Sequence, residues 1–158
     1  MKKKNIYTAG ILSLAMIGTF MMPVDAANTT VNYTEASDYV LNIPTTVTVQ
    51  KSSVTTFKIG ATSVNTNPSQ KVVVKATGGI TNGKVTLTRS GGTASTIQVT
   101  VSKTSGGTGI TTSDSLAEFQ DQSTTATSGG TIYFAAVGSA NAGSYSGTIT
   151  FTGSLANR

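Results

Sequence analysis

The chain has 158 residues, with 11 basic and 6 acidic side chains and a formal net charge of +5. It contains no histidine, cysteine or tryptophan. The sequence therefore lacks the usual general base, the thiol nucleophile and the commonest ligands of transition metals. These absences argue against most catalytic and metal-centred functions, and the fold cannot use disulfides.

The first 26 residues are typical of a secretory signal peptide. Three lysines at positions 2–4 form a cationic head, and the apolar run 11–22 is too short for a comfortable bilayer span. Small residues end this stretch, so we expect cleavage after Ala26, or as a second choice after Ala27. The alternative is a retained membrane anchor, but Pro23 ends the apolar run.

Residues 27–158 are expected to form a single domain without a membrane span, long enough for one hydrophobic core. Removing the signal peptide leaves eight basic and five acidic residues, which lowers the net charge from +5 to +3. The eight basic residues are scattered singly, whereas a nucleic-acid binder would gather them on one face beside stacking aromatics. We expect no nucleic-acid partner. An exported chain without cysteine and a lysine-headed, methionine-rich signal are typical of Gram-positive bacteria.

After the signal peptide, apolar and polar residues alternate in threonine-rich segments, which predicts β-strands. A disordered glycosylated stalk would be richer in proline than this chain, which has three. A first strand is expected through Val31 and Tyr33. After it, in chain order, the residues expected to face inward are Tyr39, Leu41, Ile43, Val47, Val49, Phe57, Ile59, Ala61, Val72, Val74, Val85, Leu87, Ile97, Val99, Val101, Ile132, Phe134 and Ala136, and in the closing strand Tyr145, Ile149, Phe151 and Leu155.

Turn residues separate these segments. Asn82-Gly83, Gly91-Gly92 and Gly106-Gly107 lie where the chain must reverse, because glycine and asparagine tolerate the positive φ of tight turns. Seven to nine short strands with spaced turns predict an all-β fold, an antiparallel immunoglobulin-like β-sandwich. A barrel is the alternative, but no uniform hairpin repeat is visible.

The segment near 113–121 departs from the alternation. Leu116 and Phe119 are spaced by three, and Ser115 followed by Glu118 resembles a capping box. We therefore expect one or two turns of helix in a crossover between strands.

The acidic residues are few for a catalytic or metal site. Paired-carboxylate hydrolysis would need two of the five that follow the signal peptide, and three of these lie on the expected helix. Their spacing also lacks the glycine-turned loop of a dedicated calcium site. We expect a solvated helix face, no catalytic residues, no enzyme activity, no cofactor and no metal. The five are Glu35, Asp38, Asp114, Glu118 and Asp121.

Tyrosines could form an aromatic platform for a sugar or a peptide. Four follow the signal peptide, at Tyr33, Tyr39, Tyr133 and Tyr145. A tyrosine at a strand end usually buries its ring and bonds its hydroxyl at the rim, so a structural role is favoured. Tyr133, opposite Phe134 in the alternation, is the candidate exposed contact.

Two stretches resemble the first and last strands of small immunoglobulin-like surface domains exported by Gram-positive bacteria, including the WxL-type group. The opening stretch is "VNYTEASDYVLNIPTTVTV" and the closing stretch is "NAGSYSGTITFTGSL". The chain departs from true WxL domains because it has no Trp-x-Leu element. It also ends without a sorting sequence, so we expect no covalent anchor. The matched residues are Tyr39, Leu41, Ile43 and Pro44, then Ala142, Gly143, Tyr145 and Gly147.

We expect a secreted, non-enzymatic surface protein with a structural or adhesive role, either released or held at the wall non-covalently. Its partners would be a cell-envelope or host-surface protein or glycan, or a second copy added at an edge strand. One alternative is a pilus-like subunit that polymerises by strand exchange, because the closing strand also resembles that of some fimbrial subunits and residues 27–33 alternate. Another is a carbohydrate-binding module that uses Tyr133.

Overall fold

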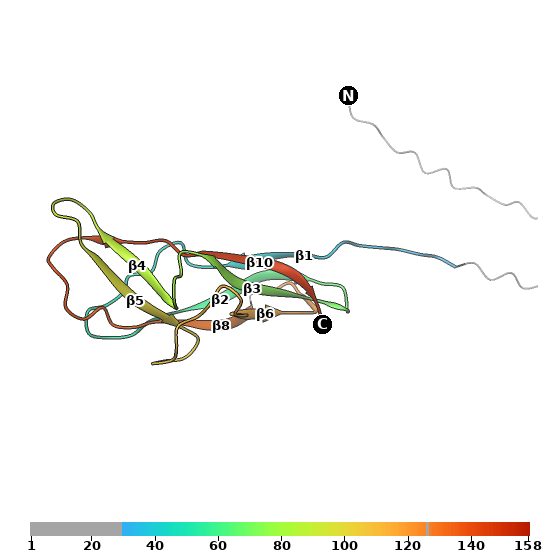
Figure 1. Ribbon diagram of the computed structural model, residues 1–158. Helices are drawn as coiled ribbons and strands as arrows, with labels where there is room; N and C mark the ends of the chain where they lie inside the picture. Colours follow the sequence, from blue (N-terminus) through green and yellow to red (C-terminus); the bar gives the residue numbers. More distant parts are fainter. Residues whose placement is uncertain (1–29, 126) are drawn as a thin grey trace, which may run out of the picture. The chain divides into compact units, whose positions relative to one another are not determined.

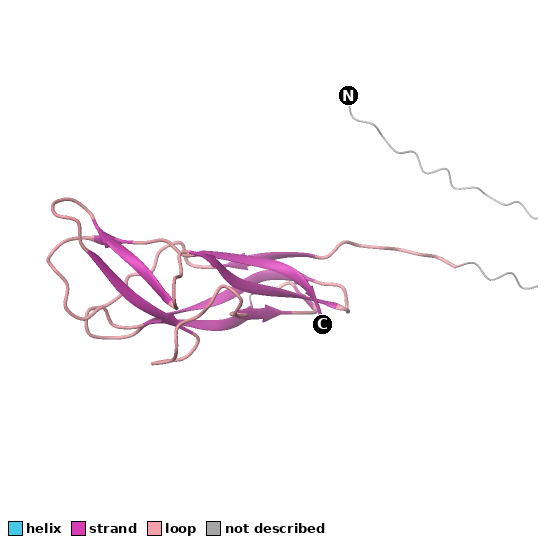
Figure 2. Cartoon of the chain, in the orientation of Figure 1, coloured by secondary structure: helices cyan, strands magenta, loops and turns pink. Residues whose placement is uncertain are grey.

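The computed structural model describes residues 30–125 and 127–158, of which those from Thr34 to Arg158 belong to one compact unit. The expected signal peptide 1–26, with its cleavage positions, lies outside the described residues. The described part of the chain contains ten strands and no helix (Figures 1 and 2). The strands are β1 (Asp38–Asn42), β2 (Thr55–Asn65), β3 (Gln70–Gly78), β4 (Lys84–Arg89), β5 (Thr96–Ser102), β6 (Ala117–Phe119), β7 (Gln122–Ser123), β8 (Thr127–Phe134), β9 (Tyr145–Ser146) and β10 (Thr150–Asn157).

The strands form two sheets in which every pair is antiparallel, which confirms the expected all-β, antiparallel class. The larger sheet has the order β1-β2-β8-β5-β4-β9, and β7 pairs with β2 beside this path. The smaller sheet has the order β10-β3-β6. Figure 1 shows β10, near the end of the chain, running beside β3.

The hydrophobic core is built from both sheets. Ile59 and Ile132 of the larger sheet and Val72 and Val74 of the smaller one are all 0% exposed. Most of the expected inward faces are confirmed, because alternation places successive side chains on opposite sides of a strand. Buried as expected are Ile59, Ala61, Val72, Val74, Val85, Val99, Val101, Ile132 and Phe134, and partly buried against them are Tyr39, Leu41, Ile43, Val47, Val49, Phe57, Leu87, Ile149 and Phe151.

The expected first strand and two inward assignments are wrong. Val31 and Tyr33 are 88% and 84% exposed and not in a strand, because they precede the compact unit. Ala136 is exposed because β8 ends two residues earlier. Leu155 is 39% exposed. Leu155 lies on β10, an edge strand of the smaller sheet, two residues beyond Gly153. Side chains of β1 cover Gly153.

The expected helix near 113–121 is also wrong. Residues Ala117–Phe119 form β6 instead, which pairs with Val72–Val74 of β3. The Leu116 N–H donates to the Val74 carbonyl at 2.8 Å, which extends this contact. A helix of two turns is marginal by itself, whereas the edge of β3 supplies hydrogen-bond partners and the core covers the apolar side chains.

The turn at Asn82-Gly83 has the conformation that its sequence predicts. The φ angles are 49° and 75°, both in the left-handed region. Thr81 and Lys84 exchange two backbone hydrogen bonds of 2.9 and 3.0 Å across the turn. This geometry matches a type I′ turn, for which Asn-Gly is the preferred pair.

The closing segment, residues 145–157, pairs with both sheets. Tyr145 and Ser146 form β9, which pairs with β4, and β10 then pairs with β3 over most of its length. Residues 147–149 connect the two sheets in close contact with other strands. A Cβ on Gly147 would collide with the Thr86 carbonyl, and one on Gly79 with the Thr148 carbonyl.

A hydrogen bond between side chain and backbone joins β1 to β10 across the two sheets. The Tyr39 hydroxyl donates to the Gly153 carbonyl at 2.7 Å. A Cβ on Gly153 would lie 2.8 Å from Leu41 Cδ1 and 2.9 Å from Tyr39 Cε2. The absence of a side chain at Gly153 therefore makes room for the residues of β1 that cover it.

The core assignment is tested by two neighbouring positions of β2. Ile59→Ala should lower the free energy of unfolding by about 2–5 kcal/mol, because Ile59 is 0% exposed and truncation leaves a cavity. Lys58→Ala, at an exposed position of the same strand, should change it by less than about 0.5 kcal/mol. Urea denaturation of both variants measures this, and equal losses would contradict the face assignment.

The bond between β1 and β10 is tested by removing one oxygen atom. Tyr39→Phe should lower the free energy of unfolding by about 0.5–1.5 kcal/mol, because the Gly153 carbonyl loses its donor. Tyr133→Phe is the matched control, since no hydrogen bond of the Tyr133 hydroxyl is found in the described structure. If both variants unfold at the same urea concentration, the bond contributes nothing.

Candidate binding groove

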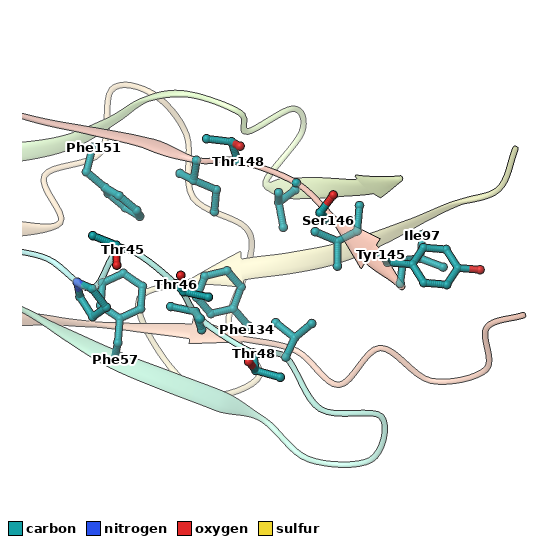
Figure 3. Close-up of a pocket in the computed structure, with 17 residues that line it drawn as sticks. Thr45, Thr46, Thr48, Phe57, Ile97, Phe134, Tyr145, Ser146, Thr148 and Phe151 are labelled. Atoms are coloured by element: carbon teal, nitrogen blue, oxygen red, sulfur yellow. The ribbon is translucent and has the colours of Figure 1, made fainter. Parts of the chain in front are cut away.

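A groove of about 590 Å³ lies where the closing segment passes between the sheets (Figure 3). Its size is within the range of about 300–1,000 Å³ that is typical of ligand sites. Two borders are formed by residues 44–49 and 145–149. The remaining lining residues are Phe57, Val85, Leu87, Ile97, Phe134 and Phe151.

Three phenylalanines from three strands meet in the groove. The ring centroids of Phe57 and Phe134 are 6.0 Å apart, and those of Phe57 and Phe151 are 5.7 Å apart with planes at 85°. Near-perpendicular packing is a favourable arrangement of aromatic rings. Phe57 and Phe134 belong to the larger sheet and Phe151 to the smaller one, so the cluster joins both sheets.

The borders of the groove consist of extended chain without strand partners. Along residues 45–49, Val47 and Val49 are half-buried against the core while Thr46 and Thr48 are exposed. This is the alternation of a strand, yet the segment belongs to no ladder. Among the described residues, no backbone-to-backbone hydrogen bond involves 45–49 or 147–149. The Thr48 carbonyl accepts a hydrogen bond from the Thr55 hydroxyl at 3.3 Å. The other peptide groups of these two segments have no partner among the described residues, as at the edge of a sheet.

The groove carries no formal charge. Apart from apolar side chains, its lining consists of threonine, serine, glycine, proline and one tyrosine. Such a lining offers no group for acid–base catalysis or metal binding near neutral pH. It suits an uncharged ligand that has apolar groups to bury and peptide groups to pair.

The three acidic residues predicted to share a helix face are separate in the structure. Glu118 forms an ion pair with Lys71 at 2.8 Å. Asp114 pairs with Lys103 at 3.4 Å, and Asp121 pairs with Arg158. Across residues 30–125 and 127–158, no three or more carboxylate, histidine or cysteine side chains converge as they would at a metal ion.

Hydrogen bonds stabilise the charged forms of two of these carboxylates. The pKa of Asp114 is lowered mainly by the backbone N–H of Thr111, at 2.6 Å, and next by the Thr111 hydroxyl. The pKa of Glu118 is lowered mainly by its hydrogen bond from Lys71, and next by the Ser115 hydroxyl. Both groups are therefore expected to stay ionised below the usual pH range of carboxylates.

The candidate contact Tyr133 is not part of the groove. It is half-buried on β8, between Ile132 and Phe134, whose side chains point to the other face and into the core. Tyr145 lines the groove, at one end of the region shown in Figure 3. Its hydroxyl lies 3.2 Å from the carbonyl oxygen of Asn141, to which it donates, so it has the rim position expected of it.

The pattern of the sequence does not reveal the groove. Alternation predicts that Phe57, Phe134 and Phe151 lie in the core, because it indicates which face a side chain occupies but not whether another layer covers it. One available signal was the proline at position 44, which ends the ladder of β1 and precedes an alternating segment.

Comparisons of the sequence with protein-family models and with curated proteins, and of the fold with solved structures, gave no significant match. A search of the described residues for a helix long and apolar enough to cross a membrane found none. The functional inferences below therefore rest on the sequence and on the geometry of the groove.

The lowered carboxylate pKa values predict a stability difference that depends on pH. Asp114 and Glu118 have lower pKa values when folded than the ordinary values of 3.8 and 4.5 for these carboxyl groups. Their contribution is therefore complete above about pH 5 and is lost as the pH falls through the folded pKa values. The double variant Asp114→Asn, Glu118→Gln should be less stable than the parent at pH 7 by less than about 1 kcal/mol per site, because both sites are partly exposed.

Urea denaturation at a series of pH values measures this difference. The unfolding curves of parent and variant should converge as the pH falls through the folded pKa values, where the parent carboxylates become protonated. A difference that stays constant from pH 7 to pH 2 would show that the charged forms are not the cause.

Proposed function

We propose that the chain is an exported, non-enzymatic surface protein of a Gram-positive bacterium with a structural or adhesive role. The observation that carries the proposal is the groove, which is uncharged, apolar and bordered by unpaired extended chain. A surface of this kind can bind a chain segment but supplies no group for a reaction. The signal-like residues 1–26 support export.

The compact unit is, in this proposal, an immunoglobulin-like β-sandwich. Two antiparallel sheets that share one core support this assignment. Further support comes from the closing segment, which pairs first with β4 and then with β3 and so contributes to both sheets. The bond from Tyr39 to Gly153 connects the sheets near the end of the chain.

The protein would act by adding a partner's strand. Extended segments recognise sheet edges through backbone hydrogen bonds, and pockets for alternate side chains supply specificity. The groove provides both, because its borders have unpaired peptide groups and the space between them is apolar. We therefore favour a protein segment over a glycan as the partner, since Tyr133 lies away from the groove.

Cell fractionation tests the proposal directly. The full-length chain is expressed in a Gram-positive host, and the cytoplasm, membrane, wall and medium are examined with an antibody to residues 34–158. Protein in the wall or the medium that begins at Ala27, or at Asn28, is the expected result. Release from the wall by concentrated urea would indicate non-covalent retention.

A signal variant serves as the control. Replacing the apolar residue Leu14 with aspartate interrupts the run 11–22 and should leave the chain uncleaved inside the cell. Unprocessed parent protein confined to the cytoplasm would overturn the proposed export, and with it the surface role.

A further inference from the structure

The borders of the groove define the segment that could fill it. Residues 45–49 and 147–149 have unpaired backbone groups, so the segment must be extended in order to pair with them. The lining combines apolar side chains with exposed residues that carry hydroxyl groups, among them Thr46, Thr48 and Thr148. Alternate side chains of the segment should therefore be apolar, and none should be charged.

One stretch of this chain outside the compact unit meets these requirements. Residues 27–33, "ANTTVNY", carry no charge, and Ala27, Val31 and Tyr33 fall on one face of an extended segment together with Thr29. Val31 is 88% exposed, although it is an apolar side chain. Seven extended residues span about 23 Å, and the border 44–49 spans about 20 Å, so the lengths agree.

We propose that the groove binds residues 27–33 of a second copy of this chain as an added strand. The inference deepens the proposed function, on which it rests, by naming the partner. The segment is joined to its own compact unit at the start of β1, whereas the groove begins at Pro44, beyond the end of that strand. The segment and the groove are different surfaces of the molecule, so the contact between two copies is heterologous. It closes when two copies exchange segments with each other, and it continues into a chain of molecules when they do not.

Val31 is the apolar side chain at the centre of the contact. Inserted between Val47 and the phenylalanine cluster, it would bury its surface while the peptide groups on either side pair with the borders. Asn32, the next residue, would face away from the groove, because successive side chains of a strand point to opposite sides. The two neighbouring positions should therefore respond differently to the same substitution.

Sedimentation velocity of the mature chain 27–158 over a range of concentrations is the first test. The parent should form dimers and longer chains. Val31→Asp should weaken association by about 100-fold or more, because it removes an apolar side chain and places a charge in an apolar site. Asn32→Asp is the matched control, with the same added charge, and should weaken association less than about 5-fold.

Disulfide trapping is the second test, and the absence of native cysteine makes it unambiguous. A Val31→Cys chain is mixed with a Val47→Cys chain and oxidised, and a disulfide-linked heterodimer is expected. Val40→Cys replaces Val47→Cys in the control, since Val40 is a 55% exposed valine that does not line the groove. Circular dichroism confirms that each variant is folded.

The outcomes separate this inference from the proposed function. A parent chain that stays monomeric at all concentrations, or association that Val31→Asp leaves unchanged, would overturn the inference. Equal trapping by Val40→Cys and Val47→Cys would do the same. Each of these results is compatible with export and a surface role, which only the fractionation experiment can reject.

Discussion

The change of sheet by the closing segment is the constraint on which the rest of the structure depends. Its first two strand residues, Tyr145 and Ser146, pair with β4, and from Thr150 onward it pairs with β3. The residues between them must cross from one sheet to the other, so they cannot remain in either ladder. Close backbone approaches at Gly79 and Gly147 hold this crossing in place. The crossing therefore ties the two sheets together and also leaves one stretch of backbone without partners.

The opposite border of the groove has a similar origin. Pro44 follows β1, lacks an N–H, and is followed by an alternating segment that pairs with no strand of the described structure. Neither 45–49 nor 147–149 belongs to a ladder of the described strands. The apolar side chains between these borders are therefore covered less completely than those of β3, where Val72 and Val74 are 0% exposed. Incomplete cover of apolar side chains costs free energy in water. No disulfide offsets this free energy, because the chain has no cysteine. An apolar surface left partly exposed in spite of its cost is typical of a site that binds a partner.

The sequence predicts the strand faces better than it predicts their surroundings. Alternation identified the inward side of β2, β3 and β8, because a strand that covers a core must place apolar residues at every second position. The same rule failed for Leu155, since an edge strand can extend past the strand that covers it. It failed as well at 116–119, where Leu116 and Phe119 fit a helical spacing but β3 offered an open edge. The groove could not be predicted, because its existence depends on which segments fail to pair, and that is a property of the whole fold.

Charge and register together explain why a neutral groove can still be selective. The three ion pairs of the described residues lie at Lys71, Lys103 and Arg158, and none of these residues lines the groove. Binding there would depend on apolar burial and backbone pairing, so salt should affect it little. Selectivity must then come from register, because a shift of one residue turns every side chain of a strand to the other face. For the segment 27–33, such a shift would place Asn32 where Val31 belongs, and an amide without a partner in an apolar site is unfavourable. The alternation that identifies the segment in the sequence is thus the same property that would fix its position in the groove.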